Sequence, residues 1–260
     1  MTALLAAVEY GGDFTLPEVG ELFNFPAFGP LGINRAIVLI FIATFFAGLL
    51  FVLAFSNAKI IPGKLQLVAE AIVEFIREQI VLQIIGPDGL KFVPLLVTMF
   101  MFIWFNNLLE ITPFVNFPTT SRIALPIFLA AISYVLFVFL GFRHHGMGYL
   151  KDVAFPPGVP KGIYVLLTPI ELVSTFVLRP FTLAIRLFAN MVAGHILLTI
   201  VFLAIHAFLA LKFPGIIVGV LTFAVSPLAV GFELFIASLQ AYIFVILTAV
   251  YISGALHPEH

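Results

Sequence analysis

Eight polar side chains interrupt two of the most apolar stretches of this sequence, and their types could hold or move charge. They are Glu171, Arg179, Arg186, Asn190, His195, His206, Glu233 and Gln240. A guanidinium stays protonated at any accessible pH, whereas imidazole and carboxyl groups can take up and release protons. A fixed charge near titratable groups in an apolar setting points to an ion path or a site for a charged substrate.

The spacing of four of these residues separates two polar surfaces on one helix. At about 100° per residue, Arg179 lies about 20° and Asn190 about 40° from Arg186, whereas His195 points about 180° away. The pattern predicts one surface that carries a fixed charge and an opposite surface that carries a titratable imidazole.

Purely structural alternatives exist for several of these residues. Arg179 could extend to lipid headgroups, His206 could pack in the interior, and Asn190 could join two helices through a hydrogen bond. Arg186 could be neutralised by an internal ion pair with Glu233 or with another carboxylate, Glu171. An ion pair would explain how the charge is tolerated, but not why both charges are present.

Composition indicates that the setting is a membrane. Of 260 residues, 62% are hydrophobic and 10% are charged, against about 25% charged residues in soluble domains. The mean hydropathy is +1.20. The net charge of −1 offers no basic surface for nucleic acid, and the absence of cysteine excludes disulfides and thiolate metal sites. The predicted class is an all-α polytopic membrane protein.

Five segments are predicted to cross the membrane, namely residues 34–56, 91–109, 123–142, 163–211 and 215–254. The last two would each reach about 60 Å or more as helices, twice the hydrocarbon thickness. Each is therefore a helical hairpin or one strongly tilted or bent helix. The first of them has no internal turn signal, which favours tilt, and Pro227 suggests a kink in the second. Residues 64–84 place polar residues on one side and predict an amphipathic surface helix.

The charge distribution predicts how the chain is oriented. Residues 1–33 are expected to form an acidic extramembrane arm, residues 34–256 a single integral membrane domain and residues 257–260 a tail. The segments 57–91 and 143–161 carry seven Lys and Arg residues, against three on the opposite side. The positive-inside rule then places the N-terminus outside and the C-terminus in the cytoplasm.

Glu171 has two interpretations under this orientation. It lies nine residues after Gly162, about 14 Å along the helix, and about 60° from Arg186. A carboxylate at that depth could accept a departing proton on the inner side. The alternative is an acid near the helix start that interacts with the positive end of the helix dipole.

Three motifs resemble those of one family. The stretches "RPFTLAIRLFANMVAGH" and "ELFIASLQAYIFVILTAVYISGAL" resemble the two signature helices of subunit a of the F-type ATP synthase, and "NNLLEITP" resembles an earlier motif of that family. The resemblance covers about residues 34–256. It implies a proton-channel stator subunit with two long tilted helices beside a rotating ring of c subunits. It also implies b-type peripheral-stalk partners, H⁺ rather than Na⁺ as the ion, no cofactor or metal, and a bacterial cell membrane rather than a mitochondrial inner membrane.

The resemblance assigns expected roles residue by residue. Arg186 matches the essential coupling arginine, which separates two offset half-channels. The proton path is expected to include Asn190, His195, Glu233, Gln240 and Glu110, the last near the outer entrance. Glu171 is added to the expected path because of its position on the helix. Arg179 is expected to have a secondary role.

One pair of sites varies within the family, and one stretch of this chain departs from the family pattern. His195 and Glu233 occupy sites where some members carry the acid and the histidine in reverse order, an exchange that suits a proton relay. The stretch "TTSRIALP", with Arg122, stands where many members have an Asp-Asn pair, so the lining of the outer vestibule is left open.

Two other function classes were weighed. A secondary transporter that binds an anionic substrate at Arg186 is the alternative, although such folds show inverted repeats and broken helices, and the sequence shows neither. An intramembrane hydrolase lacks support because GxSxG and HExxH are absent. The chain also lacks the GxxxxGK[ST] loop, so nucleotide chemistry is expected in other subunits.

Overall fold

Helices are the only regular elements in the part of the chain that the computed structural model describes. This part comprises residues 34–112, 115, 117–155, 160, 162–210 and 215–257. The predicted all-α class is therefore confirmed. The predicted N-terminal arm, and the tail apart from His257, lie outside the described residues.

Five helical segments are long and apolar enough to cross a membrane, as predicted. They are α3 (Arg35–Phe55), the run of η2 (Pro87–Phe92) and α5 (Val93–Ile111), α6 (Ala124–His145), the run of α8 (Tyr164–Val173), η4 (Ser174–Leu178) and α9 (Arg179–Ala210), and finally α10 (Gly215–Leu256). Short elements connect them, namely η3 (Thr119–Ser121) and α7 (Gly148–Ala154).

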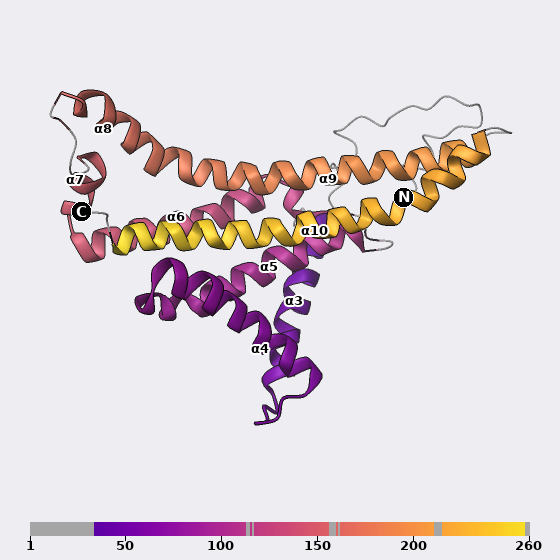
Figure 1. Cartoon of the computed structure of the whole chain (residues 1–260), viewed down its shortest axis with the longest axis horizontal. Helices are drawn as coiled ribbons and strands as arrows, with labels where there is room; N and C mark the ends of the chain where they lie inside the picture. The colour runs from indigo at the N-terminus through magenta and orange to yellow at the C-terminus, as the bar shows by residue number, and fades with distance from the viewer. Residues whose placement is uncertain are drawn as a thin grey trace.

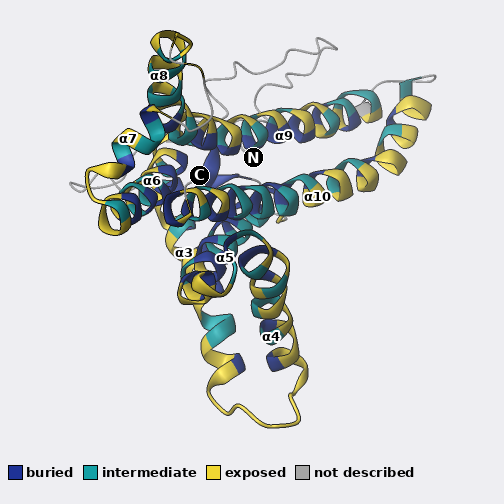
Figure 2. Cartoon of the chain, turned by 60° about the vertical axis from the view of Figure 1, so that its left-hand side comes forward, coloured by how far each residue is buried: buried dark blue, intermediate teal, exposed yellow. Residues whose placement is uncertain are grey.

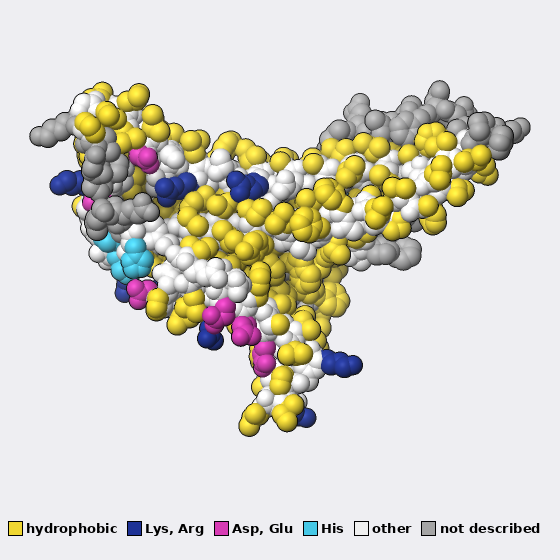
Figure 3. All heavy atoms as spheres, viewed as in Figure 1, with side chains coloured by type: hydrophobic (Ala, Val, Ile, Leu, Met, Phe, Trp, Pro, Cys, Tyr) yellow, Lys and Arg dark blue, Asp and Glu magenta, His cyan; other side chains and the backbone are white. Residues whose placement is uncertain are grey.

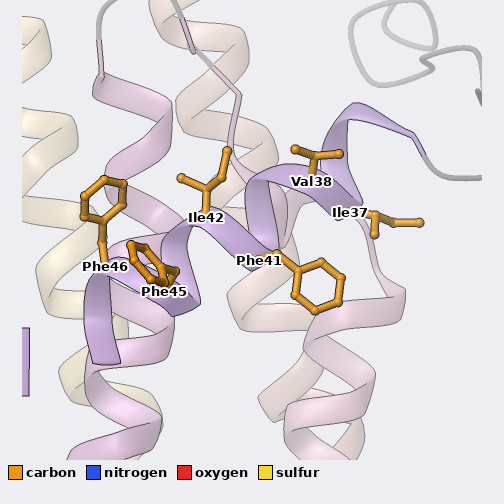
Figure 4. A pocket seen from close by; sticks show the side chains of 6 residues that line it. All are labelled: Ile37, Val38, Phe41, Ile42, Phe45 and Phe46. Carbon is orange, nitrogen blue, oxygen red and sulfur yellow. The ribbon is translucent and has the colours of Figure 1, made fainter. Parts of the chain in front are cut away.

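The first helix, α3, has two different sides. It begins at Asn34, whose side chain accepts a hydrogen bond from the Ile37 amide at 3.1 Å. Its buried residues are mostly alanines, which allow close approach to α5 and α4. The opposite side exposes bulky apolar side chains around an open hollow that involves α3 alone (Figure 4). Small buried residues on one side and bulky exposed apolar residues on the other are typical of a helix that faces lipid.

After α3 the chain turns back as α4 (Lys64–Ile76), which continues as the π-helix η1 (Arg77–Ile85). The predicted amphipathic segment 64–84 corresponds to these two helices. The turn between α3 and α4 projects away from the rest of the protein (Figure 1).

The remaining helices form the core. α10 packs against α9, α5, α6 and η1, and α6 also packs against α9. Buried side chains gather where these helices meet (Figure 2), among them Leu96, Ile103, Phe137, Leu187 and Phe244. The core therefore holds the middle of α9 and the C-terminal half of α10 in fixed positions, whereas the N-terminal half of α10 is largely exposed.

Each of the two long stretches is a helix and not a helical hairpin. Helical structure is continuous from Tyr164 to Leu209 and from Gly215 to Leu256, through Pro227. The two runs lie side by side, and α8 bends away from α9 at one end (Figure 1). The π-helix η4 lies at this bend. The angle of about 60° predicted between Glu171 and Arg186 assumes a regular α-helix, whereas η4 lies between the two residues and a π turn rotates the chain less per residue.

Candidate functional site

Three titratable side chains from three helices meet in the interior. Glu110 lies on α5, His195 on α9 and Glu233 on α10, and each is at most 4% exposed. His195 Nδ1 lies 3.8 Å from Glu110 Oε1, and the two carboxyl groups interact electrostatically. The Phe117 ring packs edge-on against the imidazole, with 6.3 Å between the ring centres. We call Glu110, His195 and Glu233 the interior cluster.

The interior cluster depends on a glycine. A Cβ atom at Gly194 would overlap the carboxyl group of Glu233, including both of its oxygens. Glu233 can therefore reach α9 beside His195 only because residue 194 has no side chain.

Several polar atoms around the interior cluster have no hydrogen-bond partner among the described residues. They are both carboxylate oxygens of Glu110, Oε1 of Glu233 and the hydroxyl of Thr199. Thr199 lies one helical turn after His195 and is buried. Other helical threonines in this chain, such as Thr248, donate to a carbonyl of their own helix. Buried polar groups without a protein partner usually bind water, so these atoms can support a chain of exchangeable protons.

A second polar contact joins the two long helices. Asn190 Nδ2 donates to Gln240 Oε1 at 2.5 Å, and Gln240 is buried while Asn190 is half-buried. Along α9, Asn190 stands between His195 and Arg186. The contact therefore continues the polar residues of the interior cluster toward the arginine.

Arg186 lies on the opposite side of α9 from the interior cluster. Its side chain is exposed, whereas His195 is buried. The alternative of an internal ion pair with Glu233 or Glu171 is wrong, because Arg186 forms no salt bridge within the described part of the chain. Lys and Arg side chains are sparse on the largely apolar surface of the long helices (Figure 3).

Arg179 faces an aromatic residue of α10. Its guanidinium carbon lies 5.6 Å from the centre of the Tyr251 ring, a cation–π contact, and Tyr251 also interacts electrostatically with Arg186. Burial raises the pKa of Tyr149, on the short helix α7, even though the positive charge of Arg179 lies nearby and lowers it. Tyr149 is therefore neutral at physiological pH.

Two of the residues singled out in the sequence stand apart. Glu171 is half-buried on α8, beyond the π-helix η4, and the structure does not bring it to the interior cluster. His206 is exposed on α9, so the alternative that it packs in the interior is wrong.

The sequence analysis missed the residues that position the end of α5. Thr119 Oγ1 donates to Asn106 Oδ1 at 2.6 Å, and Thr120 Oγ1 donates to Asn107 Oδ1 at 2.7 Å. All four residues are buried, and Asn107 also donates to a backbone carbonyl of α10. The signal was the pair of adjacent asparagines in "NNLLEITP", followed by two adjacent threonines in "TTSRIALP". The two threonines thus bond to Asn106 and Asn107 in the stretch where many members of the family have an Asp-Asn pair.

No metal-binding geometry accompanies these contacts. Within residues 34–257, apart from the short gaps named above, no group of three or more His, Cys, Asp or Glu side chains is placed to hold a metal ion.

Comparison with known proteins identifies similar chains. The family model described as "ATP synthase A chain" matches residues 36–253. The protein named "ATP synthase subunit a" of Frankia alni is 43% identical over 250 residues, which cover 92% of this chain and 86% of the relative. The protein of the same name from Pseudarthrobacter chlorophenolicus is 38% identical over 269 residues, covering 100% and 99%. That of Rhodococcus erythropolis is 38% identical over 261 residues, covering 95% and 92%.

Proposed function

Because the chain belongs to the ATP synthase subunit a family, it is an integral membrane subunit of an F-type ATP synthase, and we propose that it conducts protons through two offset half-channels separated by Arg186. The observation that carries this proposal is the division of α9, which has a buried titratable side with His195 and an exposed side with Arg186. Protons and fixed charge are thereby kept on different sides of one helix.

The proposed outer half-channel follows the interior cluster. Thr199, then the three residues of the cluster, then Asn190 with Gln240 form a series of polar groups along α9. The unsatisfied atoms of Glu110, Glu233 and Thr199 can bind water and pass protons by exchange. In this proposal the series ends near the depth of Arg186.

The proposed partner on the exposed side of α9 is a ring of c subunits, which resemblance to the family suggests. The run of α8 and α9 curves (Figure 1), and its exposed side near Arg186 includes the small residues Ala189 and Ala193, which would allow close approach of another helix. A ring carboxylate that becomes neutral by protonation can then enter lipid at low cost, whereas the charged form is attracted to Arg186. The arginine cannot relay protons itself, because a guanidinium keeps its proton at any accessible pH. We propose that b-type stalk subunits complete the stator.

The proposed orientation places the N-terminus outside and the C-terminus in the cytoplasm of a bacterial cell. Charged side chains gather along one edge of the protein, over α4, η1 and the end of α10 (Figure 3). The turn before α4, the start of α4 and the helix η2 carry Lys59, Lys64 and Lys91, and these charges favour the cytoplasmic side. The far ends of α9 and α10 would then approach the outer surface, where the integral domain of residues 34–256 receives protons.

Exchanging His195 and Glu233 tests the outer half-channel. Each single change, His195→Glu or Glu233→His, alters the set of one base and two acids in the interior cluster and is expected to lower proton-driven ATP synthesis by about tenfold or more, the usual scale for a lost proton-transfer group. The double exchange restores one acid and one base and should recover a large part of the rate. Synthesis is measured in inverted membrane vesicles energised by respiration. A double variant no better than either single variant would contradict the pairing.

Glu171 is proposed to lie near the inner exit. It is half-buried on α8 and precedes Arg186 along the chain, which is the inner side in the proposed orientation. Glu171→Gln keeps the shape but cannot bind a departing proton, so proton flux should fall and its dependence on the internal pH should change. Flux is followed with a pH-sensitive dye in reconstituted vesicles. If rate and pH profile are both unchanged, Glu171 has only the structural role at the helix start.

A further inference from the structure

The turn between α3 and α4 presents two isoleucines to the outside of the protein. Ile60 is fully exposed, and Ile61 is 85% exposed. Lys59 and Lys64, which flank them, are exposed as well. We call residues 59–64 the basic-apolar turn. The proton path described above uses none of these side chains.

A buried side chain holds the turn, and with it the two isoleucines, in the exposed position. Gln66 is only 7% exposed, and its amide group accepts from the backbone amide of Lys59 at 3.1 Å and donates to the Lys59 carbonyl at 3.0 Å. It also donates to Glu70 Oε1 at 2.7 Å. Two bonds to one backbone unit hold the turn against the start of α4. The isoleucines therefore cannot fold back onto the protein without breaking these bonds.

The length of α3 places the turn at the edge of the membrane. The helix has 21 residues, so it spans about 30 Å, the thickness of the hydrocarbon core. The basic-apolar turn begins four residues after the last helical residue, Phe55. It therefore lies where acyl chains meet headgroups.

The adjacent helix α4 also has an apolar side and a charged side. On α4, Leu65, Val68 and Phe75 are exposed apolar residues at spacings of three and seven, which lie on one side of a helix. Glu70 and Glu74 lie on another side of α4. An exposed apolar side beside a charged side is the arrangement of helices that lie in the membrane interface.

We propose that the basic-apolar turn is an anchor for anionic lipid. Ile60 and Ile61 insert among the acyl chains, while the ammonium groups of Lys59 and Lys64 extend along the interface to lipid phosphates. The positive charges of the two flanking lysines favour anionic lipid over a neutral apolar partner. The anchor fixes the membrane depth of the α3–α4 turn independently of proton conduction.

Fluorescence quenching tests the anchor directly. The chain contains no cysteine, so Ile61→Cys can be labelled specifically with a bimane dye in the assembled complex. Two vesicle types are used, phosphatidylcholine alone and phosphatidylcholine with phosphatidylglycerol. The quenchers are lipids with a nitroxide on the acyl chain and aqueous iodide. We expect strong lipid quenching, protection from iodide, and about twofold stronger lipid quenching in the phosphatidylglycerol vesicles.

Matched variants separate the parts of the anchor. Lys59→Gln with Lys64→Gln should remove the difference between the two vesicle types. Gln66→Ala leaves both isoleucines and both lysines in place but releases the turn, so lipid quenching at Ile61→Cys should decrease. A dye at the exposed polar position Gln83→Cys on η1 should be quenched by iodide instead.

Two results would overturn the proposal. One is iodide quenching at Ile61→Cys as strong as at Gln83→Cys, which would place the turn in water. The other is protection from both quenchers together with cross-linking of Ile61→Cys to another subunit, which would show that a protein covers the turn. Since ATP synthesis is not measured, failure here is distinct from failure of the proposed proton path.

Discussion

Replacing Arg186 with alanine is expected to abolish proton-driven ATP synthesis while the complex stays assembled. The side chain is exposed and forms no salt bridge within the described residues, so its removal should leave the fold intact. The loss removes the only fixed charge proposed to separate the two half-channels. A charge interaction worth about 4 kcal/mol near a protein surface corresponds to more than a 100-fold effect. Synthesis in energised vesicles is the measurement, with assembly followed by native gel electrophoresis.

The Arg186→Lys variant tests whether the charge at residue 186 must be permanent. A lysine can lose its proton in an apolar setting, whereas an arginine cannot. We expect the lysine variant to be inactive or to leak protons without synthesis. Arg179→Lys, which can keep the cation–π contact with Tyr251, is the matched control and should keep most of the activity. Synthesis at the wild-type rate in Arg186→Ala would refute the proposed role.

The second large effect is expected from a single methyl group. Gly194→Ala places a Cβ atom where the carboxyl group of Glu233 lies, so this carboxyl must leave its position against α9. A shift of about 1 Å at a reacting group can cost as much as 100-fold in rate, and we expect at least a tenfold loss of proton flux. The flux is measured in reconstituted vesicles under an imposed pH gradient.

A nearby glycine provides the control for this substitution. A Cβ atom at Gly231, two residues before Glu233 on α10, would meet no other group within 4 Å. Gly231→Ala should therefore leave the flux near wild type. Combining Gly194→Ala with Glu233→Asp shortens the displaced side chain and should recover part of the flux. Equal effects of the two alanine substitutions would show that helix propensity, and not the position of Glu233, causes the loss.

Much of the architecture could be predicted from the sequence because membrane spans depend on composition. A bilayer requires long apolar helices, so hydropathy alone located all five candidate spans. Helical periodicity likewise placed Arg186 and His195 on different sides of one helix, and their exposures differ accordingly. These properties are local, and no tertiary contact is needed to derive them.

The features that were missed depend on contacts between distant segments or on irregular turns. The π-helix η4 has no compositional signal, yet it changes every angle computed across it. The exposure of His206 depends on which parts of α9 are covered by other helices. The residue pattern of one helix cannot reveal that. The bonds between Thr119 and Asn106 and between Thr120 and Asn107 required the fold of the whole loop.

Those two threonine–asparagine bonds have a mechanical consequence. A single hydrogen bond between two segments is a pivot, since the segments can rotate about it without breaking it. Two adjacent bonds, each worth about 1 kcal/mol, resist that rotation because turning about one stretches the other. A subunit that holds still beside a proposed rotating ring experiences sideways load. In the proposed function, Asn106 and Asn107 would brace the end of α5 against such load at two points, so the carboxyl group of Glu110 would keep its position while the ring turns.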